Sequence, residues 1–142
     1  MTPSAILESA LYADDLAAAE DFYTRIMGLE RIAKAPGRHV FFRCGEGVLL
    51  IFDPAATKIP PAPDAKLPVP PHGTRGPGHL CFAATAEEID RWKAHLIRHG
   101  IAVEADFAWP PKDGEPEGGR SIYFRDPAGN SLEFAEPRIW GL

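Results

Sequence analysis

The sequence has little of what several protein classes require. Of its 142 residues only two are cysteines, Cys44 and Cys81, and both lie inside predicted strands as small core residues. The longest purely apolar run, at 48–52, is far shorter than the roughly 20 residues that span a bilayer. Lys and Arg number 15 against 20 Asp and Glu, without a basic cluster, which argues against nucleic acid as the main partner.

The N-terminal residues also lack the charged and apolar regions of a secretory signal. Together with the few cysteines, this predicts a reduced, cytoplasmic location and no membrane partner. Hydrophobic residues make up 45% of the chain, which is enough for one compact domain with a sizeable core.

The sequence does contain an internal repeat. Residues 5–53 predict a strand, a helix after Asp14 and Asp15, and three further strands, and residues 78–136 predict the same order with a helix that starts at Thr85. The predicted fold is therefore α+β, with two tandem βαβββ modules. A proline-rich connection at 54–77 and an apolar tail at 137–142 complete one predicted domain, 1–142.

The two copies differ where chemistry would sit. Overlaying the starts of the two copies pairs Glu8 with His79, and overlaying their ends pairs Ile51 with Glu133. Glu8, His79 and Glu133 carry side chains that bind divalent metals, so the pattern predicts a metal site. Each residue also has a simpler interpretation. His79 could be a hydrogen-bonded core histidine, Glu133 a carboxylate turned to water, and Glu8 an exposed residue on an edge strand.

Several short motifs resemble those of the vicinal oxygen chelate superfamily, which includes glyoxalase I, fosfomycin-resistance proteins, extradiol dioxygenases and bleomycin-resistance proteins. The motifs are Asp15-Leu, Phe22-Tyr23 and Met27-Gly-Leu-Glu in the first module, and Gly78-His79 and Tyr123-Phe-Arg-Asp-Pro-Ala-Gly-Asn-Ser-Leu-Glu in the second. The resemblance implies a curled mixed sheet around a concave central site, often in a homodimer.

The resemblance also implies that metal ligands come from the first and last strands of each module. His79 and Glu133 occupy such positions, whereas Glu8 stands where the family usually has His or Gln. Two carboxylates and one imidazole suit Mn²⁺, Fe²⁺, Ni²⁺ or Zn²⁺. Glyoxalase I uses four protein ligands and dioxygenases usually two histidines, so a three-ligand site with Glu8 disfavours both activities.

The predicted function is a metal-dependent lyase, isomerase or transferase acting on a small oxygen-rich substrate. Glu133 and Glu8 are its candidate catalytic residues, with Glu8 able to leave the metal and act as a base. Candidate substrate-binding residues are aromatic or cationic: His39, Phe41, Arg43, Trp109, Arg120 and Tyr123. Surface ion pairs are the simpler explanation for the arginines. The alternative function is a metal-free protein that sequesters a small molecule on these aromatic residues.

Overall fold

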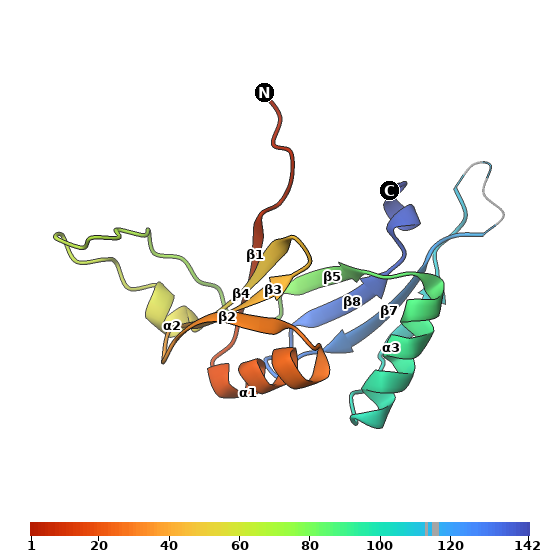
Figure 1. Ribbon diagram of the computed structural model, residues 1–142, viewed down its shortest axis with the longest axis horizontal. Helices are drawn as coiled ribbons and strands as arrows, with labels where there is room; N and C mark the ends of the chain where they lie inside the picture. Colours follow the sequence, from red (N-terminus) through yellow and green to blue (C-terminus); the bar gives the residue numbers. More distant parts are fainter. Residues whose placement is uncertain (113, 115–116) are drawn as a thin grey trace. The chain divides into compact units, whose positions relative to one another are not determined.

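The computed structural model describes residues 1–112, 114 and 117–142, which form two compact units, Met1–Pro77 and Gly78–Leu142. Each unit contains one mixed four-stranded sheet, and the element order confirms an α+β fold with two βαβββ modules (Figure 1). The loop predicted at 108–119 lies partly outside the described residues, at 113, 115 and 116. No helix in the described part of the chain is long and apolar enough to cross a bilayer.

The first unit has the sheet order β1-β4-β3-β2, in which β1 runs parallel to β4 and the other pairs are antiparallel. Its helix begins as predicted at Asp15, whose carboxylate accepts a hydrogen bond from the Ala18 amide at 2.9 Å. Gly28 follows the helix with a φ of 69°, which suits glycine. The elements are β1 (Glu8–Tyr12), α1 (Leu16–Asp21), the π-helical turn η1 (Phe22–Ile26), β2 (Glu30–Ala35), β3 (His39–Cys44) and β4 (Gly47–Phe52).

The prolines of the connection after β4 predict an extended segment. The structure differs, because part of this connection is helical. Pro54–Thr57 forms the short helix α2, because Asp53 caps its N-terminus and proline is favourable in the first turn. Among the described residues of 58–78 no further helix or strand occurs.

The second unit repeats the arrangement with the sheet order β5-β8-β7-β6. The capping box at the start of its helix is present as predicted, with the Thr85 hydroxyl bonded to the Glu88 amide and the Glu88 carboxylate to the Thr85 amide. The strand predicted at 101–107 starts later, because residues 100–103 lead the chain back from the helix. The elements are β5 (His79–Ala83), α3 (Ala86–Arg98), β6 (Ala105–Ala108), β7 (Arg120–Arg125), β8 (Ser131–Ala135) and the 3₁₀ turn η2 (Pro137–Trp140).

One face of each sheet is buried beneath its own helix. In the second unit α3 packs against that face (Figure 1). There the ring of Trp92 stacks on Phe134 with 4.5 Å between centroids. In the first unit Tyr23, on η1, is fully buried and lies 5.5 Å from the Phe42 ring. Because side chains alternate along a strand, every other residue points to the opposite face of the sheet.

The strand register corrects the equivalence that overlaying the ends of the two copies gave. Arg125 pairs with Ser131 across the second hairpin, and Arg43 pairs with Val48 across the first. The first hairpin is one residue shorter between these pairs, so Leu50 rather than Ile51 matches Glu133. Glu8 pairs with Val48 as His79 pairs with Ser131, and the equivalence of Glu8 and His79 is confirmed.

The capping box yields a stability prediction. Thr85→Ala removes the hydrogen bond to the Glu88 amide and is expected to lower the free energy of unfolding of the second unit by about 1 kcal/mol. All three tryptophans belong to this unit, so urea denaturation followed by tryptophan fluorescence reports on it. Glu87→Ala is the matched control in the same helical turn and should have less than half the effect. Equal effects of the two changes would show that the cap is not stabilising.

Candidate functional site

The open face of the second sheet brings together the chemically active side chains of this unit. Glu133, on β8, pairs with Cys81 on β5 and with Tyr123 on β7, and His79 pairs with Ser131 two residues away. Residues that pair directly across strands point to the same face. His79, Cys81, Glu133 and Tyr123 therefore share this face, opposite the one covered by α3.

His79 is held in one orientation by the backbone. Its Nδ1 lies 3.0 Å from the carbonyl oxygen of Ser131. A carbonyl oxygen only accepts, so Nδ1 carries the proton and the lone pair of a neutral ring is on Nε2. Nε2 lies 3.3 Å from Oε2 of Glu133. The sequence indicated the two residues, but not this backbone contact.

The Glu133 carboxylate is buried and incompletely satisfied. Its side chain is 6% exposed, and Oε1 has no hydrogen-bond partner. A buried carboxylate without a partner is costly, and an imidazole lone pair facing a carboxylate oxygen is repulsive. A cation between the two, either a proton or a metal, removes both costs. Imidazole nitrogen and carboxylate oxygen are donors that divalent metals accept, although no group of three or more His, Cys, Asp or Glu side chains is gathered there among the described residues.

Two further side chains beside Glu133 keep their protons at neutral pH. Burial, and then the neighbouring Glu133 carboxylate, raises the pKa of Tyr123 to about 12. The thiol of Cys81 is partly desolvated by the atoms around it, and this and then the Glu133 carboxylate raise its pKa to about 12. Cys81 is exposed on this face, so its assignment to the core was wrong: alternation directs it away from the apolar side of β5.

The turn between β7 and β8 anchors the start of β5. The Asn130 side chain is buried, accepts a hydrogen bond from the Gly78 amide at 2.8 Å, and donates one to Asp126 at 2.8 Å. The Ser131 amide in turn donates to the Gly78 carbonyl at 2.8 Å. The sequence predicted the turn, but the role of Asn130 in positioning His79 appears only in the structure.

In the first unit the open face carries a pocket of about 860 Å³. Three predicted site residues line it: Glu8 on β1, and His39 and Phe41 on β3. Arg43 is on the same strand face, but its side chain is 57% exposed, forms an ion pair with Glu30 at 3.5 Å and does not line the pocket. Within this unit, the structure brings Glu8 together with two of the predicted substrate-binding residues.

The other two candidates of the second unit differ in position. The Trp109 indole donates to the Ser121 hydroxyl at 2.8 Å and packs edge-on against Phe107, whose ring stacks on Tyr123. Arg120 alternates with Tyr123 along β7 and is therefore on the α3 side. Its guanidinium binds Asp106 at 2.8 Å and Asp90 at 2.6 Å. The simpler explanation, an ion pair, describes Arg120.

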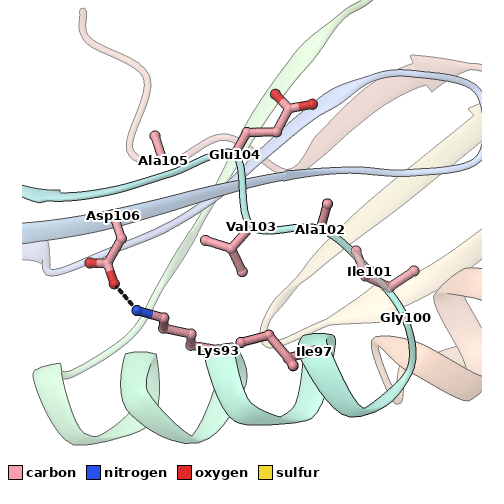
Figure 2. Close-up of a pocket in the computed structure, with 9 residues that line it drawn as sticks. All are labelled: Lys93, Ile97, Gly100, Ile101, Ala102, Val103, Glu104, Ala105 and Asp106. Carbon is pink, nitrogen blue, oxygen red and sulfur yellow. Dashed lines mark hydrogen bonds and ion pairs between the residues drawn. The ribbon is translucent and has the colours of Figure 1, made fainter.

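The second unit has a pocket of about 520 Å³ on the side of its sheet that α3 covers. Figure 2 shows Lys93 and Asp106 pointing toward one another at its wall, with 2.6 Å between Nζ and Oδ2. Ile97, Ile101 and Val103 give it an apolar lining. It holds none of the predicted metal ligands or substrate-binding residues.

The ion pairs of Asp106 predict a pH-dependent stability. Hydrogen bonds from Arg120 and then Lys93 hold the pKa of Asp106 well below its usual range. Such a carboxylate stabilises the fold above its unfolded pKa of about 3.9, and the effect disappears as pH falls through the lowered folded pKa. Asp106→Asn should therefore cost about 1 kcal/mol at pH 7 and progressively less below about pH 4. Urea denaturation monitored by tryptophan fluorescence measures this, with Glu117→Gln as control. A cost that does not change with pH would contradict the assignment.

Comparison with known proteins agrees with the fold. A family model described as the Glyoxalase/Bleomycin resistance protein/Dioxygenase superfamily matches residues 5–134. A lactoylglutathione lyase from Agrobacterium tumefaciens is 48% identical, with both chains covered completely and a TM-score of 0.89.

Two more distant structures share the fold. A putative glyoxalase family protein from Bacillus anthracis is 23% identical, with 96% of this chain and 97% of the other covered and a TM-score of 0.66. A glyoxalase/bleomycin resistance protein/dioxygenase from Nocardioides is 22% identical, with 96% and 85% covered and a TM-score of 0.70. The chain belongs to the glyoxalase/bleomycin resistance protein/dioxygenase superfamily.

Proposed function

We propose that this chain is a metal-dependent lyase that acts on a small oxygen-rich molecule. The observation that carries the proposal is the 3.3 Å contact between Nε2 of His79 and Oε2 of Glu133, beside a buried carboxylate oxygen without a partner. A divalent cation satisfies all three atoms. The 48% identity to a protein named lactoylglutathione lyase supports lyase chemistry over the transferase and isomerase alternatives.

His79 and Glu133 would hold the cation, and Mn²⁺, Fe²⁺, Ni²⁺ and Zn²⁺ all accept this mixed nitrogen and oxygen donor set. When bound, the cation supplies Lewis-acid stabilisation of negative charge on a substrate oxygen. The third ligand predicted from the sequence, Glu8, belongs to the other unit, and its role as ligand and base stays a prediction. The homodimer implied by the resemblance also stays a prediction.

The residues around Glu133 would orient the substrate. Tyr123 keeps its proton at neutral pH, because burial and the Glu133 carboxylate raise its pKa to about 12. Its hydroxyl is therefore a hydrogen-bond donor for a substrate oxygen that approaches Glu133. Phe107 stacks on the Tyr123 ring at 5.9 Å between centroids and restrains its position. The backbone bond from His79 to Ser131 fixes which imidazole nitrogen faces the ligand.

Sequestration of a small molecule without metal is the second candidate function. The aromatic surface of His39 and Phe41 in the first unit favours it, because stacking needs no metal. Metal content separates the two candidates. From the number of ligands we expected glyoxalase chemistry to be disfavoured. The Agrobacterium relative is named a lactoylglutathione lyase, which argues against that expectation. Lactoylglutathione therefore belongs in the substrate panel.

Metal binding by purified protein tests the proposal. Protein prepared without a chelator or histidine tag should retain about one divalent metal per chain in elemental analysis, because His79 and Glu133 would supply an imidazole and a carboxylate ligand. His79→Ala and Glu133→Gln should each weaken Mn²⁺ or Zn²⁺ binding in calorimetric titration by more than about a hundredfold, the upper range for outer-shell changes.

Glu46→Gln, in the exposed turn between β3 and β4, is the matched control and should bind metal as the unchanged protein does. The metal-loaded protein is then assayed for turnover of lactoylglutathione and of small hydroxy acids. If the unchanged protein binds no metal, or if the two ligand variants bind it as tightly, the lyase proposal fails and sequestration takes its place.

A further inference from the structure

We propose that the pocket of the first unit binds an aromatic ring that carries one uncharged hydrogen-bonding group. This proposal depends only on the first unit and goes beyond the proposed function, whose metal ligands His79 and Glu133 are in the second unit. The pocket has a volume of about 860 Å³, within the range of small-molecule sites.

Aromatic rings form one wall of the pocket. His39 and Phe41 are two residues apart on β3, and their rings stack with 4.0 Å between centroids and 10° between planes. Phe52, on β4, meets both of them edge-on, at 5.9 Å from His39 and 5.2 Å from Phe41. Such a group of rings offers both faces and edges to a further ring, at the separations that aromatic pairs prefer.

The connection after β4 supplies apolar side chains that are left in contact with water. Ile59, Leu67 and Val69 all line the pocket, yet they are 64%, 81% and 53% exposed. Covering apolar surface stabilises a complex by about 25 cal/mol per Å². A ring placed between these side chains and the aromatic wall would remove surface of both from water.

The polar atoms of the pocket restrict the rest of the ligand. Nδ1 of His39 is buried and has no hydrogen-bond partner. Burial, and then the charge of Arg38, lowers the pKa of His39, so the ring is neutral at pH 7 and one ligand group suffices for Nδ1. A hydroxyl serves for either tautomer, because it both donates and accepts.

Charge argues against a peptide-like anionic group in this pocket. Its cationic lining residue, Arg38, donates to the Ala56 carbonyl at 3.3 Å, and Glu8 adds a carboxylate. Glutathione carries two carboxylates and one ammonium group, and an anion here would meet the Glu8 carboxylate. A phenol or an aryl alcohol fits the lining better.

Fluorescence titration of 2-naphthol into metal-free protein tests the pocket alone, because 2-naphthol has a ring and one hydroxyl but no second oxygen for chelation. We expect saturable binding, which Phe41→Ala weakens about two- to tenfold, the equivalent of one lost aromatic pair. Phe41→Leu keeps the apolar volume and should weaken binding similarly. Ile97→Ala, in the 520 Å³ pocket of the second unit, is the matched control and should not change the affinity for 2-naphthol.

No saturable binding, or the same loss in Ile97→Ala as in Phe41→Ala, would overturn the inference. Thermal unfolding of each variant confirms that it is folded. If Phe41→Ala does not fold, Phe41→Leu decides the question.

The titration uses metal-free protein, so its outcome does not depend on metal binding by His79 and Glu133. Binding of 2-naphthol by a protein that binds no metal supports the pocket and overturns the lyase proposal.

Discussion

The carbonyl oxygen of Ser131 accepts a hydrogen bond from Nδ1 of His79 at 3.0 Å, and the chemistry of the second unit depends on this contact. The parallel pairing of β5 with β8 brings the two residues together. With its proton on Nδ1, the imidazole directs a lone pair at the Glu133 carboxylate, which is itself buried. Two acceptors in contact need a cation, and this need is the physical basis of the proposed metal site.

The division of each sheet into two faces makes room for such an arrangement. Apolar residues on one face are covered by the unit's own helix. The covered face and the helix together form most of the core. The other face is then free to carry groups that would be costly in a core. Asn130, buried in the turn before β8, holds Gly78 and thereby the first residue of β5 in register with Ser131. Site geometry and fold stability thus share the same hydrogen bonds.

Much of the fold could be predicted from the sequence, because periodicity, caps and turns are local signals. Asp15, Thr85 and Glu88 mark the starts of two helices, and both were found where these residues predicted. Equivalence between the modules was less secure. A difference of one residue between the two hairpins moves the match of Glu133 from Ile51 to Leu50 and reverses the face.

The candidate site could be predicted in its residue types but not in its contacts. His79, Glu133 and Tyr123 share one sheet face, as strand alternation indicated. Arg120 lies three residues before Tyr123 on β7 and therefore points to the other face, where it pairs with Asp106 and Asp90, which are distant in sequence. A bond to a backbone carbonyl, such as that of Ser131, leaves no mark in the sequence, because every residue has a carbonyl.

The most direct test of the central claim is anomalous diffraction from crystals of the full chain grown with Mn²⁺. The account predicts an anomalous peak bonded to Nε2 of His79 and to the Glu133 carboxylate, with Nδ1 of His79 still donating to the Ser131 carbonyl. An anomalous peak elsewhere in the molecule would contradict the account. So would the absence of a peak together with a direct hydrogen bond between the imidazole and Glu133.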